Sequence, residues 1–189
     1  MSQKLNRDEQ EILLKIARQA LEHAVRGLPR PPIDLEELPN ALQEEGASFV
    51  TLTIDERLRG CIGAIDPYQP LALDVQEHAA AAALQDFRFP RVRPSELPHI
   101  KIEVSTLTPR QPLPYDNPED LLAKLRPNID GVILQDGFKK ATFLPQVWEK
   151  LPDTEEFLSH LCLKMGASSD LWRKKPLDVY VYQVQEFHE

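Results

Sequence analysis

Apolar residues recur at helical spacing near the start of the chain. Asn6 can cap a helix, and Glu9 stands at the capping-box position three residues later. The apolar positions that follow are Ile12, Leu13, Ile16, Ala17, Ala20, Leu21 and Ala24. The pattern predicts an amphipathic helix at about residues 7–26. The next stretch, GLPRPPIDLEELP, is too rich in proline for a helix interior and predicts an extended arm.

Three further helices are predicted by their end signals. Pro70 can open a helix that carries a run of five alanines, which lets another element approach closely. Asn117 followed by a proline predicts a short helix. Asp153 begins another apolar helical pattern, and Gly166 ends it.

Between these helices the apolar pattern changes to a period of two, which is typical of strands. Short polar turns separate two pairs of these segments and predict two hairpins. The predicted strands cover residues 48–54, 58–65, 100–107, 131–135, 141–144 and 179–187, the last as one long strand. Hairpins do not fit a regular alternation of strands and helices. The pattern therefore predicts an α+β fold, with a largely antiparallel sheet and helices packed on it.

Composition narrows the class of protein. The 189 residues, 42% hydrophobic and 28% charged, suffice for one folded core, in one or two lobes. A formal charge of −8 opposes binding to a phosphate backbone, so nucleic acid is not an expected partner. The chain has no run of about 20 apolar residues and no apolar signal segment at its start. We therefore expect a cytoplasmic protein without a membrane partner.

The cysteines and histidines do not have the spacing of a metal site. Cys61 and Cys162 have no nearby cysteine partner. Cys162 lies on an apolar helix face and is expected in the core. The five histidines, at positions 23, 78, 99, 160 and 188, show no HxxxH pair. No metal or cofactor is expected from these patterns.

One pentapeptide, Arg59–Gly63 with the sequence RGCIG, is the main candidate for chemistry. Strand alternation places Leu58, Gly60 and Ile62 on one face, expected to be core, and Arg59 and Cys61 on the other. A guanidinium close to a thiol favours the reactive thiolate. The Arg59 head group is expected to be partly solvated, so its removal should cost little stability.

The flanking glycines, Gly60 and Gly63, leave room for a ligand or for another part of the chain. The alternative is that Cys61 is an inert core residue and that the glycines mark tight packing. Glu103, on the strand of residues 100–107, could face the RGCIG strand and position or accept a proton. The alternative is a structural ion pair or a solvated charge, which is the more common case because most charge pairs are not catalytic.

A charged loop follows the alanine-rich helix. Asp86 and Arg88, with Arg91 and Arg93, could form a rim that binds an anion, although such loops are usually only solvated.

Three segments form a specific combination: LRGCIG (58–63), IEVS (102–105) and ATFLPQVW (141–148). Together they resemble the AMMECR domain family, whose bacterial and archaeal members are called AmmeMemoRadiSam system protein A. The resemblance covers about residues 47–187 of what is expected to be a single domain, 1–189. Phe87 departs from the family pattern, which usually reads DPRF there.

The resemblance implies two unequal lobes with a cleft that carries LRGCIG. It also implies association with a Memo-like protein and a radical SAM protein in a modification system. It does not imply a particular reaction, because no activity is established for the family. The leading hypothesis is that this cleft binds a small ligand or a segment of a partner. The first alternative is an enzyme with Cys61 as nucleophile, assisted by Arg59 and Glu103. The second is a non-catalytic scaffold.

Overall fold

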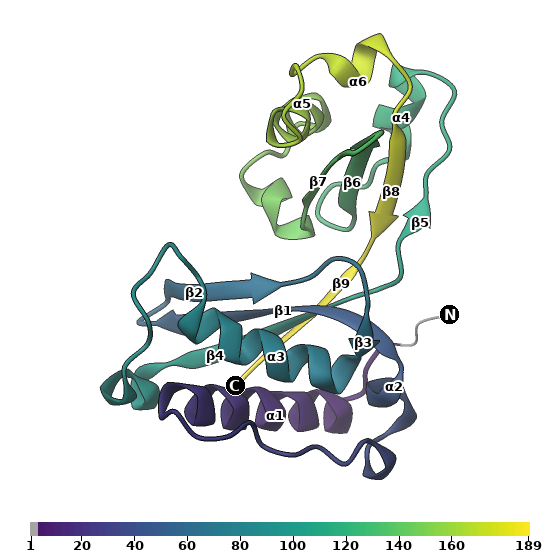
Figure 1. Ribbon diagram of the computed structural model, residues 1–189. Helices are drawn as coiled ribbons and strands as arrows, with labels where there is room; N and C mark the ends of the chain where they lie inside the picture. The colour runs from purple at the N-terminus through teal and green to yellow at the C-terminus, as the bar shows by residue number, and fades with distance from the viewer. Residues whose placement is uncertain (1–3) are drawn as a thin grey trace. The chain divides into compact units, whose positions relative to one another are not determined.

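The computed structural model describes residues 4–189 (Figure 1), and the chain divides into two compact units. Unit 1 comprises the residues up to Leu107 together with Gln185–Glu189, and unit 2 comprises Thr108–Val184. Each unit has its own hydrophobic cluster, whereas the length of the chain alone suggested one core.

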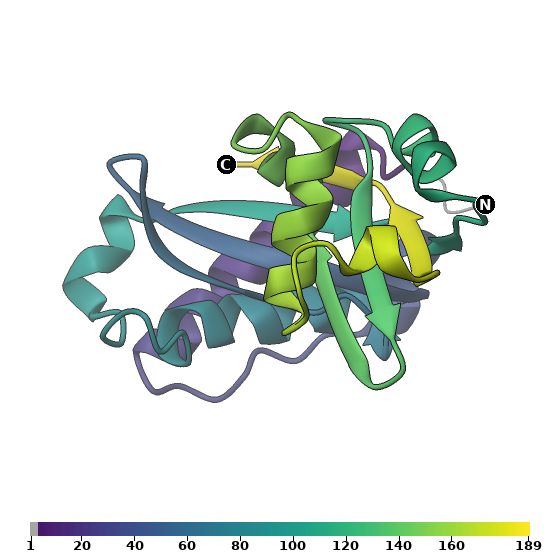
Figure 2. The same ribbon diagram turned by 90° about the horizontal axis from the view of Figure 1, so that it is seen from above.

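Unit 1 is a sheet with helices on one face, as Figures 1 and 2 show. The strand order is β2-β1-β4-β9, and the short β3 also pairs with β1. The pairs of β1 with β2, β3 and β4 are all antiparallel. The elements are α1 (Arg7–Val25), α2 (Asn40–Gln43), β1 (Glu45–Ile54), β2 (Arg57–Gly63), β3 (Gln69–Pro70), α3 (Leu71–Leu84), β4 (Lys101–Leu107) and β9 (Val184–His188), with 3-10 turns at Leu35–Glu37 and Pro94–His99.

Helix α1 forms where the sequence predicts it. The Asn6 side chain accepts a hydrogen bond from the Glu9 backbone N–H, and the Glu9 carboxylate accepts one from the Asn6 N–H. This capping box supplies partners for backbone donors that the helix itself leaves free. The buried face carries Leu13, Ala17, Ala20 and Leu21, as the apolar spacing predicts.

The hairpin of β1 and β2 is also confirmed, with an irregularity that the alternation did not predict. Its two-residue turn is Asp55–Glu56, and both residues have positive φ. The register shifts between Leu52 and Thr53, so that Leu52 pairs with Gly60 while Thr53 pairs with Leu58. The extra residue in β2 breaks the alternation of faces. Leu58 is therefore 42% exposed, and its predicted place in the core is wrong.

Helix α3 lies very close to β2. A Cβ atom added at Gly60 would stand 2.1 Å from the backbone oxygen of Ala82. The helix surface here is built of small residues, and Ala79, Ala82 and Ala83 are buried. The predicted close approach to the alanine run is confirmed, and Pro70 precedes the helix as its N-cap.

Unit 2 is a smaller sheet with helices. Its strand order is β5-β8-β6-β7, and all three pairs are antiparallel. The Trp148 ring stacks on Phe157 at 3.6 Å between centroids, and Cys162 is fully buried beside them, as predicted. The elements are β5 (Gln111–Pro112), α4 (Pro118–Lys124), β6 (Gly131–Asp136), β7 (Lys139–Phe143), α5 (Thr154–Lys164), α6 (Leu171–Lys174) and β8 (Asp178–Tyr182), with a 3-10 turn at Pro145–Glu149.

The prediction of one long strand over residues 179–187 is wrong. The segment forms two strands, β8 and β9, which belong to different sheets. Gln183 separates them. Its backbone N–H donates a hydrogen bond to the Thr108 hydroxyl, and its carbonyl accepts one from the Thr108 backbone N–H. The residues on both sides of Gln183 favour strands, so the composition of the segment does not indicate where one strand ends and the next begins.

The α+β class with antiparallel sheets is confirmed. Within residues 4–189, no helix combines the length and the apolar character that a membrane span requires.

The contact between Gly60 and Ala82 gives a first prediction. Gly60→Ala should lower the free energy of unfolding by about 1 to 3 kcal/mol, because the new methyl group meets backbone that cannot rotate away. Urea denaturation measures the change. Leu58→Val, on the exposed part of the same strand, is the control and should shift stability by no more than about 0.5 kcal/mol. Equal stability of Gly60→Ala and wild type would contradict this account of the contact.

Candidate functional site

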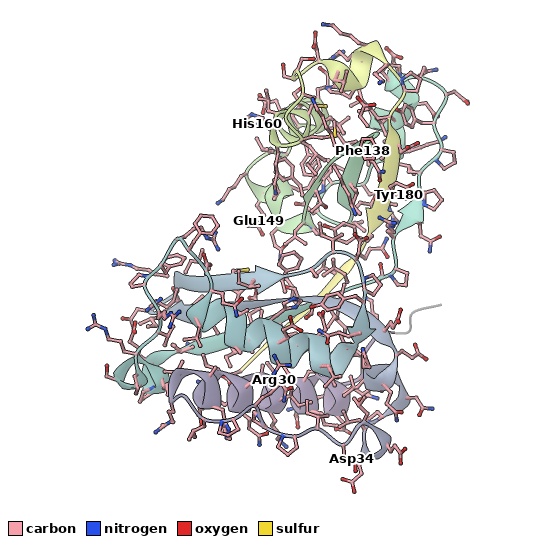
Figure 3. All side chains as sticks on the ribbon, viewed as in Figure 1. Arg30, Asp34, Phe138, Glu149, His160 and Tyr180 are labelled. Carbon is pink, nitrogen blue, oxygen red and sulfur yellow. The ribbon has the colours of Figure 1, made fainter. Side chains whose placement is uncertain are left out.

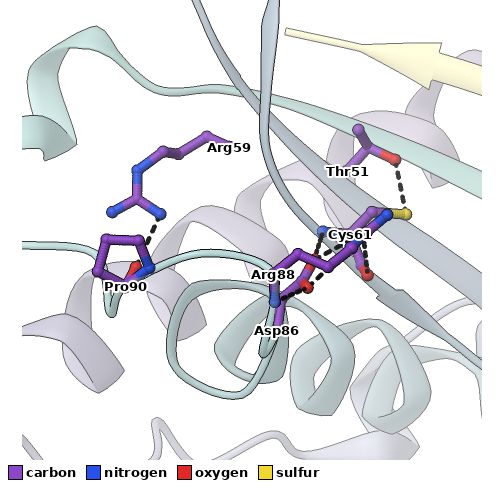
Figure 4. Close-up of polar contacts among 6 residues, drawn as sticks. All are labelled: Thr51, Arg59, Cys61, Asp86, Arg88 and Pro90. Carbon is purple, nitrogen blue, oxygen red and sulfur yellow. Dashed lines mark hydrogen bonds and ion pairs between the residues drawn. The ribbon is translucent and has the colours of Figure 1, made fainter.

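Cys61, Thr51 and Glu103 form a row across three strands of unit 1. Thr51 on β1 pairs with Cys61 on β2 and with Glu103 on β4. Directly paired residues point to the same face of a sheet. The Thr51 hydroxyl donates to the Cys61 Sγ at 3.3 Å (Figure 4). The prediction that Glu103 and Cys61 share a face is confirmed, with β1 lying between their strands.

The Cys61 thiol has a raised pKa, and its burial is the main cause. The carboxylates of Asp86 and Glu103 raise the pKa further. The hydrogen bond from Thr51 and the charge of Arg88 act in the opposite direction but do not prevail. The raised pKa favours the protonated thiol at neutral pH and does not support the hypothesis of a thiolate beside Arg59.

Arg59 is engaged elsewhere. Its guanidinium forms two hydrogen bonds with the Glu96 carboxylate, at 2.8 and 3.1 Å, and a third with the Pro90 carbonyl. Figure 4 shows the side chain extending toward Pro90 while the Cys61 sulfur points toward Thr51. The Arg59 side chain is 14% exposed. The head group is partly solvated, as expected. Its ion pair with Glu96 does not support the expectation that its removal costs little, because the loss of Arg59 would leave Glu96 without this partner.

Asp86 and Arg88 hold the outer edge of β2 at Cys61. The Asp86 carboxylate accepts a hydrogen bond from the Cys61 backbone N–H at 2.9 Å. Arg88 donates to the Cys61 carbonyl at 3.4 Å and pairs with Asp86 at 2.7 Å. Since β2 is an edge strand, these contacts replace those of a further strand. The Arg88 charge is neutralised by Asp86, which weakens the predicted anion-binding rim at this residue.

Two carboxyl groups in this region have lowered pKa values. Hydrogen bonds from Arg88 are the largest cause for Asp86, and hydrogen bonds from Arg59 are the largest cause for Glu96. Both carboxylates are therefore ionised at neutral pH, and each stabilises the fold as long as it stays charged.

The two glycines of RGCIG are required by packing within unit 1. Gly60 lies against Ala82, as described above. A Cβ atom at Gly63 would stand 2.4 Å from the Phe49 ring and from the Ser48 carbonyl. The packing explanation of both glycines is thereby supported, and their role in ligand binding stays a prediction.

Thr51 and Glu96 are contacts of this site that the sequence did not single out. The sequence could have indicated Thr51, because a hairpin with a two-residue turn at Asp55–Glu56 brings this residue near Cys61. Glu96 lies 37 residues from Arg59, and spacing along the chain does not pair them.

A cavity of about 430 Å³ lies elsewhere in unit 1, against α1 and the C-terminal residue. None of the predicted site residues lines it. Its lining consists of Glu11, Leu14, Lys15, Arg18, Gln19 and Glu189.

Comparison with known proteins extends the resemblance to nearly the whole chain. The family model described as AMMECR1 matches residues 14–187. A protein of Methanothermobacter thermautotrophicus is 41% identical over 186 residues, which cover 98% of this chain and 96% of that protein. A Methanopyrus kandleri protein is 40% identical, covering 100% and 92%. The crystal structure of an uncharacterised Pyrococcus horikoshii protein aligns with a TM-score of 0.88 and 32% identity, covering 99% and 94%.

The ion pairs of Glu96 and Asp86 predict instability in acid. A carboxyl group with a lowered pKa in the folded state stabilises the protein above its unfolded pKa, near 4, and loses that contribution as the pH falls. The free energy of unfolding should therefore fall as the pH drops below about 5. Urea denaturation at a series of pH values measures this dependence.

The matched variant for this test is Glu96→Gln, which keeps the shape of the side chain but cannot ionise. Its stability should be lower than that of wild type at neutral pH and should change less with acidification. Glu37→Gln, at an exposed position, should follow the wild-type curve. If Glu96→Gln also followed the wild-type curve, the ion pair would contribute nothing to folding.

The raised pKa of Cys61 predicts slow alkylation by iodoacetamide at neutral pH. The rate should be below that of free cysteine and should rise with pH, because the thiolate is the reacting form. Cys162 is fully buried and should react more slowly still. Mass spectrometry distinguishes the two sites, and urea-unfolded protein, in which both cysteines are open, is the control. Faster reaction of Cys61 than of free cysteine would contradict the prediction.

Proposed function

Because the chain belongs to the AMMECR1 family, we propose that it uses the row of Glu103, Thr51 and Cys61 to bind a small polar ligand or an extended segment of a partner protein. The observation that carries the proposal is the gathering of a carboxylate, a hydroxyl and a thiol on one sheet face. All three residues are half-buried, so hydrogen bonds to them would be partly shielded from water.

The chemistry of the row favours a ligand that donates hydrogen bonds. The Glu103 carboxylate accepts hydrogen bonds, and the Thr51 hydroxyl both donates and accepts. Backbone N–H groups of an extended peptide, or amide and amine groups of a small molecule, match these acceptors. A strongly anionic ligand does not match, because Glu103 and the neighbouring Asp86 are both carboxylates.

Binding fits the thiol better than catalysis does. A nucleophilic cysteine is usually activated by a base or by a lowered pKa. Here the pKa of Cys61 is raised, and Arg59, which would have lowered it, pairs with Glu96. An enzyme with Cys61 as nucleophile, Arg59 as activator and Glu103 as base thus has less support. Fast alkylation of Cys61 at neutral pH would favour it again.

We place this binding role in a modification system, as the family resemblance suggests. The protein would work in the cytoplasm with a Memo-like protein and a radical SAM protein, and one of them would supply the bound segment. The segment would lie in a cleft that carries LRGCIG. A scaffold role without a bound ligand is the remaining alternative.

The test is direct binding to purified partners. Memo-like and radical SAM proteins from the same organism are titrated against the full chain, and binding is followed by calorimetry. Glu103→Gln should weaken binding by roughly tenfold, because hydrogen bonds to a charged group contribute about 1.5 to 3 kcal/mol. Glu37→Gln, an exposed glutamate elsewhere in unit 1, is the matched control and should bind as wild type does.

Two results would overturn the proposal. The first is that neither partner binds the wild-type chain. The second is that Glu103→Gln and Thr51→Val both bind with wild-type affinity, which would move the interface away from the row. Thermal unfolding of each variant shows that a loss of affinity does not come from loss of the fold.

A further inference from the structure

A second group of polar residues lies on the helix-covered face of the same sheet. It consists of Ser48 on β1, Asp74 and His78 on α3, and Tyr68 in the segment between β2 and β3. The first three are buried, at 0%, 0% and 5% exposure, among apolar core residues. Buried polar groups of this kind need partners or a function.

Asp74 is the fixed inner end of the group. Its Oδ2 accepts a hydrogen bond from the Ser48 hydroxyl at 2.6 Å and lies 3.1 Å from the His78 Nδ1. Its other oxygen, Oδ1, is buried and has no hydrogen-bond partner among the described residues. The Ser48 hydroxyl also lies 3.4 Å from the His78 Nδ1, so Ser48, Asp74 and His78 contact one another. Leaving the buried Oδ1 of Asp74 unsatisfied costs stability.

The contacts assign the tautomer of His78. The Asp74 carboxylate accepts hydrogen bonds, so the neutral imidazole carries its proton on Nδ1. Nε2 then holds a lone pair, and it lies 3.5 Å from the Tyr68 hydroxyl. A carboxylate behind a histidine, with the free ring nitrogen directed outward, is the arrangement that orients a general base.

Tyr68 forms the outer end of the group. The residue is 52% exposed, and its ring meets the His78 ring edge to face at 6.4 Å. Partial burial, followed by the charges of Asp74 and Glu77, raises the pKa of Tyr68, and a hydrogen bond with the Glu77 side chain acts in the same direction. The Tyr68 hydroxyl therefore keeps its proton at neutral pH, and Glu77 and His78 both lie within reach of it. The carboxylate of Glu77 is held in turn by the Gln69 side chain at 2.9 Å. The acidic surroundings disfavour an anionic ligand.

We propose that Tyr68, His78 and Asp74 form a proton-relay site that opens at the Tyr68 hydroxyl and acts on a neutral ligand through a hydroxyl group or a water molecule. A ligand hydroxyl or a water molecule gives a proton to the Tyr68 oxygen while the Tyr68 proton passes to the His78 Nε2. The oxygen that lost its proton bonds to the carbonyl carbon of a neutral ester, and the carbonyl π bond opens. The π bond forms again as the bond from this carbon to the leaving oxygen breaks, and the proton held by His78 returns through Tyr68 to the leaving group or to solvent. Asp74 is a positioning residue that balances the imidazolium charge.

This site is separate from the row of Cys61. Ser48 and Thr51 stand three positions apart on β1, so their side chains point to opposite faces of the sheet. The proposal therefore does not depend on ligand binding at Cys61, and each proposal can fail alone.

The probe is p-nitrophenyl acetate, an activated neutral ester whose hydrolysis releases acetate and coloured p-nitrophenolate. Thiols also attack this ester, so the full chain carrying Cys61→Ser is the starting protein. Adding His78→Gln should lower the protein-dependent rate of hydrolysis roughly tenfold. This is a modest effect, because a positioned general base contributes ~10² to 10⁴-fold to a reaction rate. His160→Gln, an exposed histidine on α5 (Figure 3), is the matched control and should leave the rate unchanged.

A further variant separates a relay from a structural role. Tyr68→Phe, at a half-exposed position, should also lower the rate while leaving the thermal unfolding temperature close to wild type.

If His78→Gln does not fold, nitrogen NMR of the wild-type protein still tests the proposal by identifying the protonated ring nitrogen. A proton on Nδ1 supports the relay, and a proton on Nε2 overturns it. Equal hydrolysis rates in the Cys61→Ser protein and in its Tyr68→Phe derivative would also overturn it.

Discussion

The close packing of α3 on the sheet of unit 1 determines where the polar chemistry of this unit lies. At Gly60 the backbone of β2 and the Ala82 carbonyl approach so closely that no side chain fits between them. Helix α3 ends at Leu84, and Asp86 follows two residues later, beside the outer edge of β2. The hydrogen bond of Asp86 to the Cys61 N–H is thus a direct consequence of where the helix ends.

The same contact restrains Cys61. Its backbone N–H and C=O are both held by the Asp86–Arg88 pair, and its thiol accepts a hydrogen bond from Thr51. The nearby charges largely oppose each other, because Arg88 favours the thiolate while Asp86 and Glu103 disfavour it. Burial then decides the direction of the shift. A protonated, well-positioned thiol is suited to contact a ligand, and poorly suited to attack one.

Much of unit 1 follows from local sequence signals. The capping box at Asn6 fixed the start of α1, and the period-two pattern identified β1, β2 and β4. The same alternation indicated that Glu103 could face Cys61 if their strands lie near each other, and the pairing of both with Thr51 meets this condition. These features depend on neighbours within a few residues or on strand faces, which periodicity reports directly.

The failures arise where distant residues decide the outcome. Spacing put Arg59 beside Cys61, but a long side chain can turn toward any partner within reach, and Glu96 provides two acceptors. The break at Gln183 depends on hydrogen bonds to Thr108, which lies 75 residues earlier. Strand propensity carries no information about such contacts, because it describes a residue and not its partner.

The polar group around Asp74 lay within reach of sequence reasoning. Asp74 and His78 are four residues apart on one helix, which places them on the same face. Ser48 alternates with Val50 and Leu52 on the core face of β1, so strand periodicity places a polar residue on the face that α3 covers. Helical periodicity places Asp74 and His78 together, and strand periodicity places Ser48 on the core face of β1. The packing of α3 on β1 brings these residues into contact and leaves Thr51 on the other face with Cys61. One strand thus presents polar groups to two separate environments.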